Sequence, residues 1–226
     1  MRSWAPMLAA LVLVAGCSKT VGGQSQPTRL TPLPGPPSTS TITASVPVLT
    51  SAPDPGAPIA EVAAWIAAGE PADAAAFHTA TRDGAATDLG DDVAFVTPSG
   101  KTKCATYAKF TGALMCLVEL KNPPPKPADF PTEWVGGWVD FDGKTLSVGS
   151  PHGDPGPFTN GDGPQLPYGS TLKFGDYQCR SDQVGLYCTT NSHESAARYS
   201  DAGIEPFGCL QPVTPPPADI GLKFSC

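Results

Sequence analysis

The cysteines constrain the fold of this chain more than any other feature. Six of the seven follow residue 103: Cys104, Cys116, Cys179, Cys188, Cys209 and Cys226. An even set of cysteines in an exported chain is typical of a disulfide framework. A metal site is the alternative, but the intervals between these cysteines do not resemble the spacing of zinc ligands, and the histidines are scattered. We therefore expect three disulfides and no metal.

The seventh cysteine, Cys17, ends a pattern typical of a lipoprotein signal. Arg2 gives a positive start, residues 7–15 are almost wholly apolar, and Ala15-Gly16 precede the cysteine. The apolar run is too short to span a bilayer. We expect residues 1–16 to be removed and the Cys17 sulfur to carry diacylglycerol. The sequence thus predicts an exported protein of the cell envelope, anchored to the outer face of the cytoplasmic membrane by a lipid on Cys17. An ordinary signal peptide with a chance cysteine is the alternative.

Residues 17–58 are expected to form the lipid anchor and a disordered tether. Residues 18–58 contain 9 prolines, 13 serines or threonines and 3 charged side chains. Such a segment buries too little apolar area to offset its chain entropy. The chain from Cys17 onward has 13 basic and 21 acidic side chains. This balance argues against nucleic acid as a partner, since phosphates require clusters of Lys and Arg.

Residues 59–226 are predicted to form a single domain that is mainly β, a disulfide-stapled antiparallel sheet built of hairpins. One short helix is expected at residues 59–68, where apolar residues recur at helical spacing between Pro58 and Gly69. The remaining segments alternate β-branched or aromatic residues with turn residues. We expect strands at residues 93–96, 102–107, 113–120, 138–141, 144–148, 170–179, 186–190 and 222–225.

Two of the expected strand pairs have a cysteine on each arm and a glycine near the turn. Opposed Cβ atoms of paired strands lie about 4.5–5.5 Å apart, which is close enough for a disulfide after slight adjustment. We therefore predict the sequential pairing Cys104–Cys116, Cys179–Cys188 and Cys209–Cys226.

Asp142-Gly143 is predicted to be a two-residue hairpin loop, because this dipeptide favours the type I′ turn. That loop pairs Val139 with Leu146 and Phe141 with Lys144. It also leaves Trp138 and Asp140 on a face that is otherwise polar. An aromatic ring among small polar residues and carboxylates is typical of a surface that binds sugars or peptides.

Trp134, Trp138 and Asp140 are therefore the candidate binding surface, with residues 149–169, which include Phe158 and Tyr168, as the adjoining loop. A core position for Trp138, beneath a covering loop or helix, is the alternative.

Several motifs resemble a known family. They are Phe95-Val96-Thr97-Pro98-Ser99-Gly100, Leu166-Pro167-Tyr168-Gly169, Gly175-Asp176-Tyr177-Gln178-Cys179 and Gly185-Leu186-Tyr187-Cys188. With the Cys17 signal, the Pro/Thr-rich tether and residues 195–209, they are similar to mycobacterial LppI-type lipoproteins. The resemblance covers roughly residues 90–210 and implies an exported β-domain with paired cysteines. It implies no catalytic residue and no cofactor.

Other groupings resemble catalytic or metal sites only in part. Ser150, His152 and Asp154 lie within five residues, whereas the members of a triad normally converge from distant segments. His193-Glu194 could serve acid–base chemistry, although a hydrogen-bonded loop is commoner. The fragments at residues 140–143 and 160–163 lack the later glutamate of a calcium loop. We predict no catalytic residues from these motifs.

Three functions remain open at this stage. The first is a lipid-anchored binding or scaffolding module, with a cell-wall or envelope protein as its candidate partner. The second is an envelope glycan or peptide hydrolase that uses two of the carboxylates of Asp140, Asp154 and Glu194 across a cleft. The third is a carrier of an apolar ligand, which requires a large apolar cavity. An enzyme is the less favoured class, because no complete catalytic motif is found.

Overall fold

The structure of the chain is a computed structural model that describes residues 51–110, 112–128, 130–190 and 194–226. The predicted signal peptide, Cys17 and nearly all of the predicted tether lie outside the described residues. The described part is mainly β, with two large sheets, one α-helix and three disulfides. This confirms the predicted fold class.

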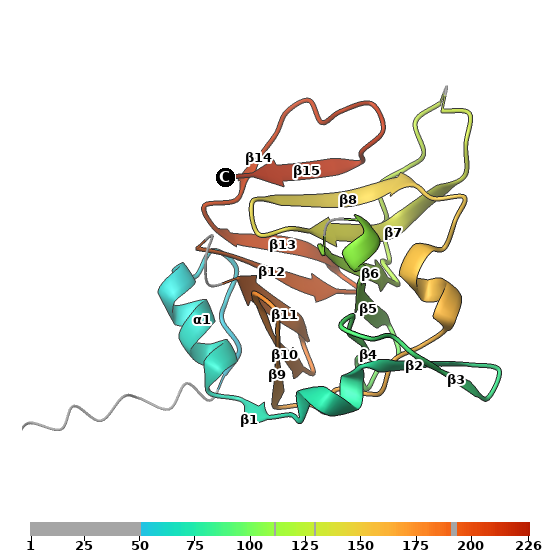
Figure 1. The fold of residues 1–226 in the computed structure, drawn as a ribbon. Coiled ribbons are helices and arrows are strands. Elements are labelled where there is room, and N and C mark those ends of the chain that lie inside the picture. The colour runs from blue at the N-terminus through green and yellow to red at the C-terminus, as the bar shows by residue number, and fades with distance from the viewer. Residues whose placement is uncertain (1–50, 111, 129, 191–193) are drawn as a thin grey trace, which may run out of the picture. The chain divides into compact units, whose positions relative to one another are not determined.

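The larger sheet, here called sheet I, has seven strands in the order β14-β15-β8-β7-β6-β5-β4, all paired antiparallel (Figure 1). Its strands are β4 (Ala94–Val96), β5 (Thr102–Thr106), β6 (Leu114–Val118), β7 (Trp134–Phe141), β8 (Thr145–Pro151), β14 (Gln211–Pro212) and β15 (Leu222–Ser225).

The second sheet, sheet II, has six strands in the order β1-β9-β10-β11-β12-β13. Its strands are β1 (Glu70–Pro71), β9 (Ser170–Phe174), β10 (Tyr177–Asp182), β11 (Gly185–Thr190), β12 (Ser195–Ser200) and β13 (Gly203–Gly208). Strand β1 runs parallel to β9, and the other pairings are antiparallel.

Each sheet contains five consecutive strands paired in sequence order, β4–β8 in sheet I and β9–β13 in sheet II. In each run a disulfide joins the second strand to the third. Cys104 lies directly opposite Cys116, with a Cα–Cα distance of 4.1 Å, and Cys179 lies opposite Cys188 at 4.0 Å. The third disulfide joins Cys209, after β13, to Cys226 at the chain end. The predicted pairing is confirmed.

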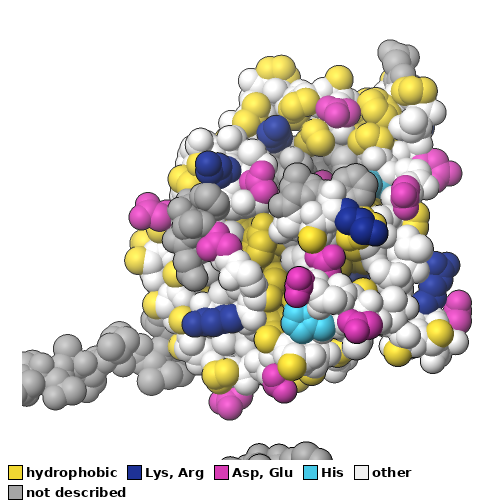
Figure 2. Space-filling model, viewed as in Figure 1, with side chains coloured by type: hydrophobic (Ala, Val, Ile, Leu, Met, Phe, Trp, Pro, Cys, Tyr) yellow, Lys and Arg dark blue, Asp and Glu magenta, His cyan; other side chains and the backbone are white. Residues whose placement is uncertain are grey.

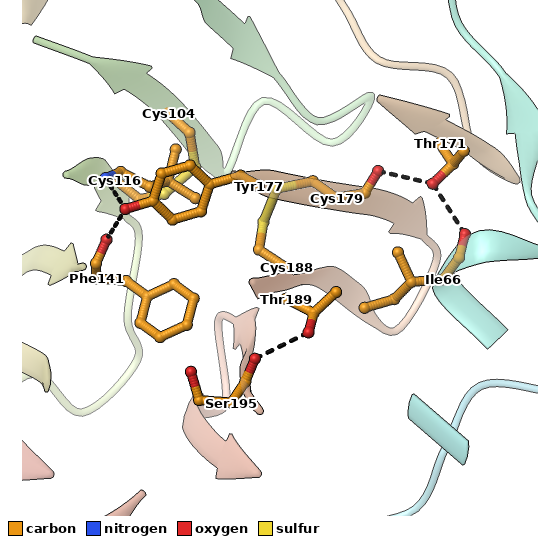
Figure 3. The surroundings of a disulfide bond; sticks show 11 residues. Ile66, Cys104, Cys116, Phe141, Thr171, Tyr177, Cys179, Cys188, Thr189 and Ser195 are labelled. Carbon is orange, nitrogen blue, oxygen red and sulfur yellow. Dashed lines mark hydrogen bonds between the residues drawn. A yellow bond between two sulfur atoms is a disulfide. The ribbon is translucent and has the colours of Figure 1, made fainter. Parts of the chain in front are cut away.

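The inner faces of the two sheets pack on one another and form the main core. Both cross-strand disulfides lie in this core, with Tyr177 of β10 reaching from sheet II to sheet I (Figure 3). The Tyr177 hydroxyl donates to the Phe141 carbonyl oxygen at 2.9 Å and accepts from the Leu114 amide at 3.3 Å. Burial raises the pKa of Tyr177 to about 12, so the hydroxyl keeps the proton that it donates.

Helix α1 (Ile59–Ala67) covers the outer face of sheet II, close to the predicted bounds. Its buried side chains Val62, Trp65 and Ile66 pack on Tyr187, Ala196 and Phe207 of the sheet. The carbonyl of Ile66 at the end of the helix accepts hydrogen bonds from the Gly69 amide at 3.3 Å and from Thr171 Oγ1 at 2.8 Å. The helix is thereby held to β9.

The packed chain begins before Ile59, where the sequence analysis places the start of the domain. Pro53 is buried, and its carbonyl oxygen accepts a hydrogen bond from the Tyr187 hydroxyl at 3.2 Å. Because a buried hydroxyl requires a partner, Tyr187 holds this part of the proline-rich segment against the fold.

A separate two-stranded hairpin and a short helix cover the outer face of sheet I. The hairpin joins β2 (Thr79–Arg82) to β3 (Ala85–Asp88), and the 3-10 helix η3 spans Gly156–Asn160. Asp83 and Gly84 both have positive φ, 52° and 82°, as a type I′ loop requires. The sequence analysis did not predict this hairpin. Two further 3-10 helices are η1 (Ala74–Phe77) and η2 (Ala108–Phe110).

Candidate functional site

The β7–β8 hairpin positions the predicted binding residues, and its register differs from the prediction. Val139 pairs with Val148 instead of Leu146, and Phe141 pairs with Leu146 instead of Lys144. Since each partner moves by two residues, every side chain keeps its face of the sheet. The apolar residues of β7 and β8 are fully buried in the core, as expected: Val139, Phe141, Leu146 and Val148.

The Asp142 carboxylate accounts for this shift. Its Oδ1 accepts hydrogen bonds from the amides of Lys144 and Thr145 at 2.8 and 2.6 Å. The Asp142 amide donates to the Thr145 carbonyl oxygen, so these two residues form the last pair. The loop is therefore Gly143-Lys144, with Gly143 at a φ of 87° in the first position, where a type II′ turn takes glycine.

Trp138 is buried, so the exposed aromatic patch expected at this residue is a wrong prediction. Only 2 % of Trp138 is exposed. The ring stacks on His152 with 3.4 Å between ring centres, and Phe158 of η3 meets it edge-on at 5.4 Å. The strand pattern alone places Trp138 on a polar face. The segment that follows β8 folds back over this face and covers the ring.

Asp140 lies beside Trp138 on the same face and accepts a hydrogen bond from its indole Nε1 at 2.9 Å. Burial raises the pKa of the Asp140 carboxyl, and the negative charge of Asp142 raises it further. The bond from Trp138 acts in the opposite direction. Burial also lowers the pKa of His152, against the opposing effect of Asp154. Trp138 and Asp140 are thus brought together as predicted, with Trp138 buried and Asp140 half-buried.

Trp134 lies apart from this pair, although it belongs to the same strand. The register of β7 against β8 shifts between Val135 and Val139, which marks a bulge. A Cβ at Gly137 would lie 2.1 Å from the Val118 carbonyl oxygen, so the close approach at the bulge requires glycine. Trp134 instead donates from Nε1 to the Pro124 carbonyl oxygen at 3.0 Å. The predicted three-residue surface is therefore divided.

A small pocket opens next to Trp138. Its volume is about 130 Å³, and its lining residues are Met115, Trp138, His152, Asp154, Gly156 and Pro157. A wider groove of about 430 Å³ shares Asp154, Gly156 and Pro157 with the pocket. The groove is also lined by residues of β3, β5 and η3, together with Asp92, Tyr107 and Lys109. The two hollows therefore meet at Asp154.

Ser150, His152 and Asp154 do not form a triad. The Ser150 hydroxyl is buried without a hydrogen-bond partner in the described part of the chain. Asp154 Oδ1 accepts from the Gly156 amide at 2.9 Å, as a turn residue does. His152 packs on Trp138 through its ring face. His152 and Asp154 thus line the pocket, whereas Ser150 does not.

The remaining candidates are dispersed. Glu194 precedes β12 of sheet II and lines a separate hollow with Ile59 and Phe207. His193 lies outside the described residues. Asp162 forms an ion pair with Lys103 at 2.8 Å. Within the ranges that the structure describes, no three potential metal-ligating side chains gather.

The sequence analysis missed several residues that build this site. Met115 reaches the pocket because it lies opposite Asp140 across β6 and β7. Pro157 and the groove residues Asp88, Asp92 and Tyr107 come from segments without a recognisable motif. Of the predicted adjoining loop, Phe158 contacts Trp138, whereas Tyr168 is exposed and lines another hollow. The length of the loop was the only available signal.

No protein-family model matches the chain, and no curated protein and no solved structure is significantly similar to it. Across the described ranges, no helix has the length and apolar character needed to cross a membrane.

Proposed function

We propose that this chain is a lipid-anchored ligand-binding protein of the cell envelope, held at the outer face of the cytoplasmic membrane through Cys17. The signal pattern at residues 1–17 and the proline-rich segment after it support the anchor. Three disulfides in the described part support an exported domain. The resemblance to mycobacterial LppI-type lipoproteins agrees with both and stays a prediction.

The outer face of sheet I is the ligand site in this proposal. The observation that carries it is the junction of an apolar pocket with a polar groove at Asp154. Ligand sites combine an apolar enclosure with a few placed polar groups. Here Met115, Trp138 and Pro157 supply the enclosure. The bond from Trp138 to Asp140 holds the indole in a fixed orientation, which reduces the entropy cost of binding.

A hydrolase is the second candidate, favoured by the raised pKa of Asp140, since a general acid needs a carboxyl that holds its proton. Asp140 is not among the residues that line the pocket or the groove, however, and Glu194 lies on sheet II. A carrier of a large apolar ligand has less support, because the apolar pocket of about 130 Å³ is smaller than the ~300–1,000 Å³ of typical ligand sites.

Native mass spectrometry of the full lipoprotein, gently extracted from its own membrane, tests the proposal. We expect a discrete added mass on the wild-type protein. Met115→Phe should remove it, since the larger ring fills the pocket. Leu222→Phe is the control, because Leu222 is an exposed apolar residue of β15 that lines neither the pocket nor the groove. A clean wild-type mass, or an adduct that persists in Met115→Phe, contradicts the proposal.

A further inference from the structure

The groove beside the pocket carries an excess of negative charge. Three carboxylates line it, Asp88, Asp92 and Asp154, against one basic side chain, Lys109. Figure 2 shows Asp and Glu side chains spread over the whole face that it views. Because the groove is concave and its walls are protein, the field of these charges is focused inside it. A cationic group gains most from such a field.

The three carboxylates are held in place by the backbone. Asp88 Oδ1 accepts from the Gly90 amide, and Asp154 Oδ1 accepts from the Gly156 amide, each at 2.9 Å. Asp92 Oδ1 accepts from the Ala108 amide at 2.9 Å and from a threonine hydroxyl at 3.1 Å. The second oxygen of each carboxylate takes no part in these bonds. A bound cation would therefore meet oriented acceptors at little ordering cost.

The groove wall already holds one cation of the chain itself. The Lys109 ammonium lies over the ring of Tyr107, 5.9 Å from its centre, within the range of a cation–π contact. This internal ammonium shows that the groove wall accommodates a cationic group against an aromatic ring.

The adjoining pocket indicates the size and polarity of the uncharged part of the ligand. Its lining is mostly apolar, and its volume of about 130 Å³ is close to that of an engineered apolar cavity of about 150 Å³ that binds benzene. A group up to the size of a phenyl ring fits it. Asp154 lines both the pocket and the groove. A positive charge attached to the apolar group in the pocket would therefore reach the Asp154 carboxylate.

We infer that the site binds an ammonium group carried next to a small apolar group. The apolar group enters the pocket at Trp138, and the ammonium lies in the groove beside Asp154. This inference rests on the proposed function, since it names the ligand class of the same site. A free amine and a lysine side chain of a peptide both offer this chemistry.

Titration of the full lipoprotein in detergent micelles at low salt tests the inference, with three small probes. Phenethylamine has both groups, 2-phenylethanol lacks the charge, and methylamine lacks the ring. We expect phenethylamine to bind at least tenfold more tightly than either of the others. The readout is the indole N–H resonance of Trp138, with the indole resonances of Trp65 and Trp134 as internal references outside the pocket.

A matched pair of variants locates the charge. Asp154→Asn keeps an oxygen for the Gly156 amide and should weaken phenethylamine binding at least tenfold, with little effect on 2-phenylethanol. Asp219→Asn alters an exposed carboxylate in the segment between β14 and β15 and should change neither affinity. Equal affinity of Asp154→Asn and the wild type for phenethylamine overturns the inference.

The source of the ammonium is resolved by two blocked dipeptides, acetyl-Phe-Lys-amide and acetyl-Phe-Glu-amide. Tighter binding of the lysine peptide than of phenethylamine identifies a peptide, and the reverse order identifies a free amine. If 2-phenylethanol binds as tightly as phenethylamine, the inferred charge is wrong while the proposed pocket stands. If no probe shifts the Trp138 resonance, both the inference and the proposed site are overturned.

Discussion

Among single residues, Asp140 orients the indole of Trp138 on the outer face of sheet I. Asp140→Ala leaves the buried Nε1 donor without this acceptor, and an unsatisfied buried donor costs about 1–3 kcal/mol. We therefore predict that Asp140→Ala lowers the free energy of unfolding by about this amount. Urea denaturation of the variant and the wild type measures the difference.

Asp140→Asn is the control for this prediction, because the amide keeps an oxygen that accepts from Nε1. It also resembles the protonated carboxyl that burial favours. We expect it to lose less than half of the stability that Asp140→Ala loses. Equal losses would mean that the indole bond does not account for the effect.

His152 gives the same face a dependence on pH. Burial lowers its pKa from the ordinary value of 6.5, so the unfolded chain takes up a proton more readily than the folded protein. The free energy of unfolding should therefore fall as the pH drops below about 6.5. His152→Phe keeps a ring to stack on Trp138 and removes the titration. Thermal unfolding between pH 7 and pH 5 should show a shallower decline for this variant. Parallel curves would contradict the assigned role of His152.

The burial of Trp138 shows why residue-level prediction from sequence reached only part of the site. Alternation along β7 correctly separates Val139 and Phe141 from Trp138 and Asp140. Alternation reports the face of a residue but carries no information on what covers that face. The cover comes from His152 and Phe158, which follow β8 in a segment without a periodic pattern.

Among the elements, the third disulfide holds the edge of sheet I. Cys209–Cys226 joins the chain after β13 to the end of β15, across a sequence separation of 17. A crosslink of this span contributes about 3 kcal/mol in the chain-entropy account. We predict that replacing both cysteines with Ala lowers stability by about this amount. In hydrogen exchange, β14 and β15 should lose protection by a larger factor than β10 and β11. Equal factors in all four strands would show that the crosslink acts only on the unfolded chain.

One strand that the sequence did not predict, β12, has an identifiable physical cause. Strand β12 contains Ala196 and Ala197, which have low strand propensity. Both are fully buried, with Ala197 opposite Cys188 and Ala196 opposite Thr189. Small side chains fit at these positions because the Cys179–Cys188 disulfide lies on one face of β12 and helix α1 lies on the other. Tertiary packing thus overrides local preference. The strands of Cys104, Cys116 and Cys188 were predicted because their own residues favour β structure. The single strand predicted over residues 170–179 is instead two antiparallel strands, β9 and β10, with a turn at Gly175-Asp176.

For the molecule as a whole, the sequence predicted the class of fold but not its layering. The cysteine-bearing strand pairs, β5 with β6 and β10 with β11, could be expected from the paired cysteines. The stacking of the two sheets through Tyr177 and Phe141 could not, because no local pattern specifies which sheet faces which. The start of the packed chain was also missed, since Pro53 is held by the distant Tyr187. Contacts between distant segments account for each of these differences.

The anchor is the property of the whole chain on which the proposed location depends. If Cys17 is acylated, the N-terminal peptide of the mature protein begins at residue 17 and carries at least two acyl chains, which suffice for stable anchoring. We predict this mass for the wild type, and an unacylated N-terminus that retains residues 1–16 for Cys17→Ala. Ser18→Ala is the control and should process normally. A wild-type N-terminus without lipid would refute the anchor and leave an ordinary signal peptide, while the pocket at Trp138 would still require its own test.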